Sequence, residues 1–291
     1  MMNFSLKHLF VFLLFSSSLN GQSFFLDVIE ESGKDLPFKP KTSHASVFER
    51  RDALRTYILR LQDDGFLAAG VDSLSGDETK QTAHIYLGQK FNWSSLYPLD
   101  VDGAALSAAG YKNRLYSDRP FRLASTKKMM RKILRYYENH GYPFAKVRFD
   151  SLENKEGYLK AGIRVEKGEL IKIDSLTIRG DAKITNRYLY NYIGIEPGDL
   201  YNESLLASLS TRLKELPFIT EQRPAEVFLL DEAALIRLYL KTRKASNFNG
   251  IIGFLPNNQE TGKLLLTGEA NLRLKNSLGR GESIIAEWRR L

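Results

Sequence analysis

IKIDSLTI, residues 171–178, is the segment that decides the fold. Apolar and polar residues alternate along it with a period of two, which predicts a half-buried β-strand. Gly180 follows, and beyond it two helices and then two strands are predicted, in this order: 185–193, 202–215 (ending at Pro217), 225–230 and 234–241. The order β-α-α-β-β defines a small α+β unit that spans residues 169–245.

The same pattern occurs twice more, upstream of this unit. In each earlier copy a helix runs into a glycine and an aromatic residue, Gly141-Tyr142 or Gly65-Phe66, and two strands joined by a polar turn follow. A repeated pattern of this length predicts tandem modules, which we place at 22–90, 91–168 and 169–245. In the first module a polar segment, residues 31–46, occupies the place of the first helix. That helix is therefore expected to be missing or reshaped, and the module is degenerate.

The helix predicted at 127–140 is amphipathic. Met130, Ile133, Leu134 and Tyr137 recur along it at spacings of three and four, which makes one apolar stripe. Gly141 is expected to be its C-cap, with a positive φ. Four residues at the ends of elements are assigned structural roles on these grounds: Gly65, Gly141, Gly180 and Pro217.

The pattern changes from residue 247 onward. Residues 263–275 alternate over more than ten positions, whereas soluble strands usually have about 5–6 residues and transmembrane β-strands about 9–11. With flanking strands at 249–255 and 282–290, we predict the first antiparallel strands of an outer-membrane β-barrel at 246–291. The alternative is an amphipathic sheet in a soluble domain. About three strands cannot close a barrel, since bacterial barrels have at least eight, so we expect an incomplete barrel on a fragment or truncated product of a longer chain.

The N-terminus has the order of a secretory signal peptide. Lys7 and His8 precede an apolar run, residues 9–15, and small and polar residues follow as far as Gly21. The apolar run is shorter than the roughly 20 residues that a membrane-spanning helix needs. We predict a signal peptide at 1–21 and hence export; the alternative is a buried N-terminal helix.

The net charge of +8 limits the possible partners. Lysine and arginine are spread along the chain and mixed with acids, whereas nucleic-acid binding requires a clustered basic patch. Nucleic acid is therefore not expected as a partner. Attraction of the excess positive charge to anionic lipid head groups is the preferred interpretation.

No motif for chemistry is found in the sequence. There is no cysteine, and we predict no catalytic residues, no cofactor and no metal site. His44, His84 and His140 have no partner at the spacing of a zinc helix and are interpreted as surface residues. The acidic pairs Glu30-Glu31 and Asp63-Asp64 are interpreted as solvated charge.

Several segments together resemble one known family. LIKIDSLTIRG (170–180) is similar to the first strand of a polypeptide-transport-associated (POTRA) domain, and PGDLY (197–201) and LKELPFI (213–219) are similar to its turn and second helix. NSLGRG (276–281) resembles an early barrel hairpin. The chain after residue 21 thus resembles the outer-membrane protein assembly factors (BamA/TamA-like, or bacterial surface antigen proteins), which carry POTRA domains before a C-terminal barrel.

This resemblance implies a non-enzymatic factor for outer-membrane protein assembly, insertion or translocation, with periplasmic modules anchored at the outer membrane. The implied partners are unfolded outer-membrane protein clients, other envelope assembly proteins and outer-membrane lipid. The resemblance also places the second strand of each module at an open sheet edge, where an extended client can add as a strand. The residues expected to bind partners there are Val147, Arg148, Phe149, Asp150, Ala225, Glu226, Val227, Phe228, Leu229 and Leu230. The alternative is an envelope scaffold whose modules bind folded assembly or secretion partners.

Overall fold

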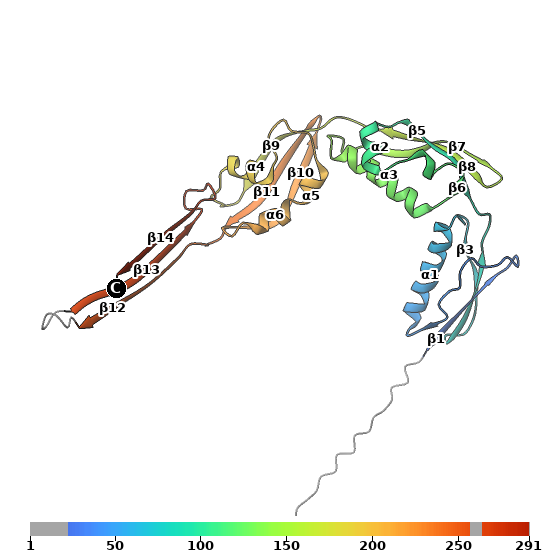
Figure 1. Cartoon of the computed structure of the whole chain (residues 1–291), viewed down its shortest axis with the longest axis horizontal. Coiled ribbons are helices and arrows are strands. Elements are labelled where there is room, and N and C mark those ends of the chain that lie inside the picture. The colour runs from blue at the N-terminus through green and yellow to red at the C-terminus, as the bar shows by residue number, and fades with distance from the viewer. Residues whose placement is uncertain (1–22, 257–263, 291) are drawn as a thin grey trace, which may run out of the picture. The chain divides into compact units, whose positions relative to one another are not determined.

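The computed structural model describes residues 23–256 and 264–290. The signal peptide predicted at 1–21 and the turn predicted at 257–262 lie outside these residues. The chain divides into two units: Met1–Ser94 with Asp118–Ala124 and Asn154–Leu159, and the remaining residues. Within the described residues the strands form four separate sheets (Figure 1). The module boundaries given above remain a prediction.

The third sheet confirms the β-α-α-β-β order. Its elements are β9 (Lys172–Arg179), α4 (Asn186–Ile193), α5 (Glu203–Ala207), α6 (Leu209–Glu215), β10 (Ile219–Leu230) and β11 (Ala233–Thr242). The strand order is β10-β11-β9, with β11 antiparallel to β10 and parallel to β9. Two polar residues in a row, Asp174 and Ser175, interrupt the strict alternation of this segment, and the pairing of β9 with β11 has a register irregularity at the same point.

The second helix of this module differs from the prediction of one helix at 202–215. It is divided at Ser208, which ends α5 and begins α6. The Ser208 hydroxyl donates a hydrogen bond of 2.8 Å to the carbonyl oxygen of Leu205, a local bond that competes with regular helix. Leu209 and Leu213 are nonetheless buried in the core with Leu176 and Leu189, so the second half of the helix packs on the core of the module.

The second module follows the same order with two short additions. Its elements are β5 (Asn92–Asp100), α2 (Gly103–Ala109), the 3-10 helix η1 (Asn113–Leu115), β6 (Arg119–Pro120), α3 (Leu123–Glu138), β7 (Lys146–Lys155) and β8 (Tyr158–Glu166). The strand order is β6-β5-β8-β7. The stripe predicted on α3 is partly wrong: Thr126, Met129, Ile133 and Tyr137 are the buried residues, while Met130 and Leu134 are only half-buried.

The first module has one helix, as the polar segment 31–46 led us to expect. Its elements are β1 (Phe24–Glu30), β2 (Ser43–His44), α1 (Val47–Asp63), β3 (Gly70–Gly76) and β4 (Lys80–Tyr86). The short strand β2 pairs with β1 at one side of the sheet, whose order is β2-β1-β4-β3. A small core forms between α1 and this sheet around Leu26, Leu61 and Ile85.

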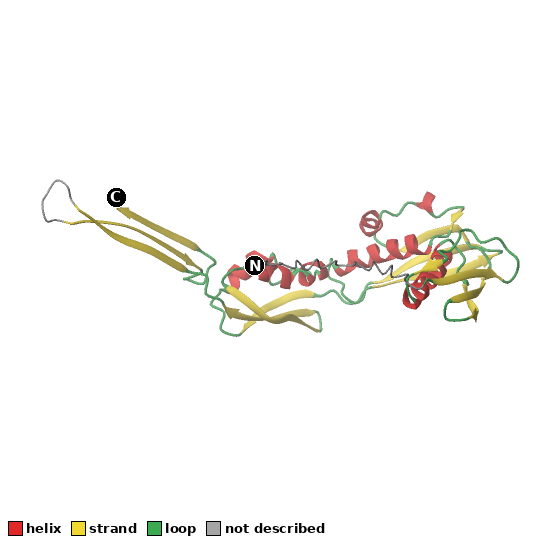
Figure 2. Cartoon of the chain, turned by 90° about the horizontal axis from the view of Figure 1, so that it is seen from below, coloured by secondary structure: helices red, strands yellow, loops and turns green. Residues whose placement is uncertain are grey.

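The C-terminal strands form a meander, β12 (Asn247–Pro256), β13 (Leu264–Lys275) and β14 (Ser283–Arg290). Figure 2 shows no helix over either face of this sheet. The register places Ala270 opposite Gly250 on one side and Trp288 on the other. Paired residues share a face, so one face carries the following apolar side chains, all of them well exposed: Phe248, Ile252, Phe254, Leu266, Ile284 and Trp288.

Candidate functional site

Two of the strands predicted to bind partners lie at the ends of their sheets. β10, which contains Ala225–Leu230, is paired only with β11 in the order β10-β11-β9, and β7, which contains Val147–Asp150, ends the order β6-β5-β8-β7. A terminal strand leaves one row of backbone N–H and C=O groups without a strand partner. The structure therefore places all ten candidate residues on edge strands.

The edge of β10 is regular over only part of its length. The pairing with β11 shifts register between Glu221 and Arg223 and again between Arg223 and Glu226, so Pro224 and Ala225 lie in a bulge. From Glu226 to Leu230 the pairing is continuous. Proline in a strand marks an edge or a bulge, a signal in the sequence that would have moved the start of the candidate stretch from Ala225 to Glu226.

Side chains on β11 hold the regular part of β10. The Tyr239 hydroxyl donates a hydrogen bond of 2.6 Å to Glu226, and Arg237 lies across from Glu226 at 3.8 Å. The Arg237 guanidinium also lies over the Phe228 ring, 4.6 Å from its centroid. All of these contacts are made by residues of β11, the neighbouring strand. They hold β10 in the sheet and leave the backbone groups on its opposite edge without a strand partner.

The edge of β7 is held in a similar way by β8. Arg148 pairs with Glu166 at 2.8 Å, and Asp150 pairs with Arg164 at 2.6 Å. The hydrogen bond from Arg164 holds the pKa of Asp150 below its usual range. Ser151, directly after the candidate residues, has a φ of 53°, which interrupts the extended backbone. The regular edge is thus Lys146–Asp150.

The glycine after each long helix joins its module to the next strand. At Gly141 (φ 92°), the carbonyl oxygen accepts from Ile171 N–H at 2.7 Å, and the N–H donates to the Tyr201 carbonyl at 2.9 Å. At Gly65 (φ 101°), the carbonyl oxygen accepts from Phe91 N–H at 2.9 Å. The two glycines lie in equivalent backbone junctions.

The aromatic residue after each of these glycines closes the helix. Tyr142 N–H donates to the Tyr137 carbonyl at 3.0 Å, and Phe66 N–H donates to the Leu61 carbonyl at 3.1 Å. A bond from five residues ahead is the mark of a Schellman helix end. The glycine–aromatic step in the sequence is therefore a helix end and a module junction at once.

Two carboxylates at these junctions are not ordinary surface charge. Asp64, interpreted above as solvated, has a side chain only 15% exposed and forms ion pairs with Lys90 and Arg122. Burial alone would raise the pKa of Asp64, but the two cations outweigh it and hold the pKa below its usual range. At the other junction burial and the nearby Glu203 raise the pKa of Glu138.

Two other interpretations of charged or polar residues need correction. His44, expected at the surface, is 2% exposed; its Nε2 lies 3.0 Å from the Lys41 carbonyl oxygen. Glu30, expected to be solvated, is 8% exposed and accepts a hydrogen bond of 2.8 Å from Lys34 N–H. Glu30 ends β1 and His44 lies on β2, so their burial depends on the assembled first module and not on a local pattern.

Within the described residues, no group of three or more histidines, cysteines or carboxylates is placed to hold a metal ion. In the same part of the chain, none of the helices combines the length and the apolar character needed to cross a bilayer.

Comparisons with known proteins find likeness in solved structures. No protein-family model matches the chain, and no curated protein matches it. The POTRA3-5 structure of BamA from Haemophilus influenzae is 14% identical with a TM-score of 0.49, and the match covers 75% of this chain and 96% of that one. BamA from Haemophilus ducreyi lacking POTRA domains 1-3 is 17% identical with a TM-score of 0.44, over 69% and 37% of the two chains.

CdiB from Acinetobacter baumannii is 12% identical with a TM-score of 0.39, and the match covers 82% of this chain and 45% of that one. The chain thus spans less than half of the CdiB structure and of the Haemophilus ducreyi BamA structure. The matches include BamA, after which the family that the sequence resembles is named.

Proposed function

We propose that this chain is an exported, non-enzymatic member of the outer-membrane protein assembly factor family whose periplasmic modules bind unfolded, β-rich clients by strand addition. The observation that carries the proposal is the pair of regular open edges, Lys146–Asp150 on β7 and Glu226–Leu230 on β10. An extended client segment pairs with the free backbone groups of such an edge.

Strand addition suits a factor that handles many clients. Backbone hydrogen bonds form whatever the side chains are, so the edge recognises extended conformation and not one sequence. Each edge is about five residues long, comparable to an ordinary strand. The cross-strand contacts of Arg148 and Glu226 keep each edge strand in its sheet, so a client can pair with a preformed template.

The C-terminal sheet supports placement at the outer membrane. Its apolar face is exposed on all three strands, from Phe248 and Ile252 on β12 to Trp288 on β14. The other face is mixed: it carries polar residues such as Asn271 and Glu287 and also the exposed Ile251 and Ile285. Alternation of this kind over β13, which has 12 residues, fits strands with one face toward lipid. We therefore propose that β12–β14 are the first strands of a membrane barrel and that residues 1–21 direct export.

The test uses proline at neighbouring positions of β7. Consecutive N–H groups of a strand point to opposite edges. One of the two variants, Arg148→Pro or Phe149→Pro, therefore removes a donor that pairs with β8, and the other removes a donor from the open edge only. A peptide from an outer-membrane barrel strand, carrying a photoreactive residue, is crosslinked to the full chain. The labelled fragments are mapped by mass spectrometry, and circular dichroism reports which variant keeps its fold.

The proposal predicts label on β7 and β10 in the unmodified chain. The folded proline variant should lose most of the β7 label and keep the β10 label, which serves as the internal control. Unchanged β7 label in that variant would show that the open edge is not the binding surface. Binding of one folded partner, with no label from the peptide, would favour the scaffold.

A further inference from the structure

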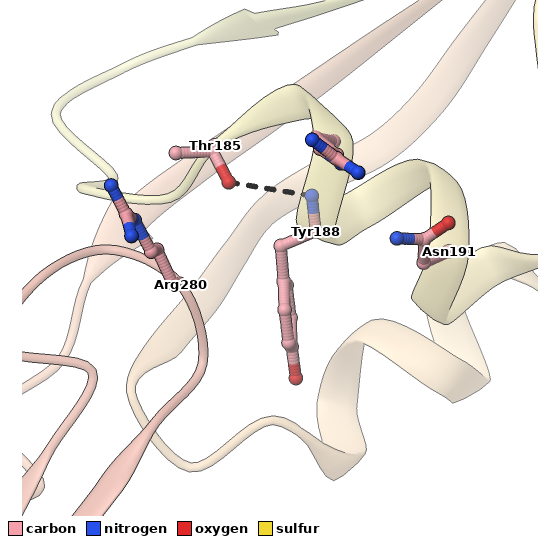
Figure 3. Close-up of a pocket in the computed structure, with 5 residues that line it drawn as sticks. Thr185, Tyr188, Asn191 and Arg280 are labelled. Carbon is pink, nitrogen blue, oxygen red and sulfur yellow. Dashed lines mark hydrogen bonds between the residues drawn. The ribbon is translucent and has the colours of Figure 1, made fainter.

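A pocket of about 520 Å³ lies where the third module meets the turn between β13 and β14. Among the described residues its lining consists of two arginines and three neutral polar side chains: Thr185, Arg187, Tyr188, Asn191 and Arg280. Figure 3 shows Arg280 reaching toward the start of α4, beside Thr185, with Tyr188 and Asn191 further along the helix. The pocket thus combines positive charge with hydroxyl and amide donors.

The turn that carries Arg280 is fastened to the module. Thr185 N–H donates to the Gly279 carbonyl at 2.9 Å, and the Asn276 side-chain amide donates to the Lys183 carbonyl at 2.8 Å. The Asn276 amide oxygen also accepts from Gly281 N–H at 2.8 Å. Asn276 is only 9% exposed. These bonds hold Arg280 beside α4.

The Tyr188 ring packs on the backbone of the same turn. A Cβ atom added to Gly281 would lie 2.0 Å from Tyr188 Cε2, so the glycine permits this close contact. Glu282 is the nearest carboxylate in sequence, and its two oxygens accept backbone N–H groups of Leu278 and Arg280. Within the described part of the chain, the guanidinium groups of Arg187 and Arg280 form no ion pair.

We propose that this pocket binds a phosphate group, carried by a lipid headgroup at the membrane surface or present as free phosphate. Two guanidinium groups are suited to phosphate oxygens through charge-assisted, bidentate hydrogen bonds, and the Thr185, Tyr188 and Asn191 side chains supply further donors. The proposal that a phosphate group binds is argued from the pocket alone. The proposal that a lipid carries this phosphate also rests on the proposed placement at the outer membrane. Occupation would tie the turn at Arg280 to α4 and so brace the module against the membrane sheet.

The experiment uses the full chain, with Arg187→Gln and Arg280→Gln combined. The matched control is Arg114→Gln with Arg131→Gln, which removes the same charge from two exposed residues of the second module. One arm measures inorganic phosphate by equilibrium dialysis. The other measures co-sedimentation with phosphatidylcholine vesicles, with and without one quarter phosphatidylglycerol, at about 0.15 M salt. The measured quantity is the ratio of binding to vesicles with and without phosphatidylglycerol. Insertion of the exposed apolar residues would increase binding to both kinds of vesicle and leave this ratio unchanged.

The lipid source predicts a preference for phosphatidylglycerol that falls roughly tenfold or more in the double variant and less than threefold in the control. Free phosphate as the ligand predicts loss of dialysis binding in the double variant, with no vesicle preference to lose. If the double variant equals the control in both arms, or the unmodified chain binds in neither, the proposal is overturned. A chain that sediments with no vesicle but binds phosphate through these arginines would count against membrane placement only.

Discussion

Gly180 follows β9 in the third module, and replacing it with alanine would place a methyl group against the backbone of the central strand, β11. Gly180 has a φ of 115°, a conformation that residues with a side chain rarely adopt. An added Cβ would lie 2.2 Å from the Leu240 carbonyl oxygen and 3.1 Å from the Leu240 carbonyl carbon. Leu240 is fully buried on β11, which is paired on both sides, so its backbone cannot withdraw.

Two costs add up in this variant. The backbone conformation costs about 1–3 kcal/mol, and the overpacking costs about 1–3 kcal/mol. We therefore expect Gly180→Ala to lower the free energy of unfolding of the third module by about 2–6 kcal/mol. Gly110→Ala is the control, because Gly110 also has a positive φ, 71°, but no atom lies within 4 Å of its added Cβ. It should cost only about 1–2 kcal/mol, and in the second module.

Hydrogen exchange of the β11 amides in the full chain measures this local stability. At the lower bound of 2 kcal/mol, exchange should be about 30-fold faster in Gly180→Ala than in the unmodified chain. Gly110→Ala should leave β11 exchange unchanged. If β11 exchanged at the same rate in Gly180→Ala and in the unmodified chain, the close approach of Gly180 to β11 would be refuted.

Three further outcomes are expected. Gly141→Ala should cost less than Gly180→Ala, roughly 1–3 kcal/mol, because the atoms nearest its added Cβ are the side-chain ends of Leu170 and Leu200, both partly exposed, and not a buried backbone oxygen. Hydrogen exchange of the α3 amides measures this cost. Burial and Glu203 raise the pKa of Glu138, so the charged form of Glu138 destabilises the folded state above that pKa. Glu138→Gln removes this charge and should raise the thermal unfolding midpoint at pH 7. Near pH 4, where Glu138 is protonated, the two proteins should unfold at the same temperature. The two basic partners of Asp64 outweigh its burial and lower its pKa, so its contribution is present at neutral pH and lost as the pH falls through the folded pKa; Asp64→Asn should cost about 1–2 kcal/mol at pH 7 in urea unfolding and little in acid.

Local patterns predicted the long helices and strands and their order, but not the short elements β2, η1 and β6 or the division of the helix at Ser208. The alternation around Ile173 predicted β9, and the repeat of a glycine–aromatic step after each long helix predicted the modules, because helix ends and strand periods depend on neighbouring residues. The stripe on α3 was misread by one position. Met129 and Met130 are adjacent and equally apolar, and the packing of α3 in the folded module buries Met129.

Features set by distant residues were not predictable in this way. Asp64 meets partners 26 and 58 residues further along the chain, and His44 is buried by the pairing of β2 with β1. The pocket beside α4 brings together Arg187 and Arg280, which are far apart in the sequence and which no local pattern connects. Pro224 is the exception, because proline in a strand marks a bulge or an edge and here coincides with the bulge that shortens the β10 edge.

The central claim is tested most directly by crosslinking in living cells that export the chain. A photoreactive residue is placed at Phe228 on the β10 edge or at Arg148 on the β7 edge, and at the exposed Lys128 on α3 as the control. Strand addition predicts crosslinks from both edges to several different outer-membrane barrel proteins, caught before they fold, with little or none from Lys128. Crosslinks from the edges to a single folded envelope protein, or equal yields at Lys128, would contradict it.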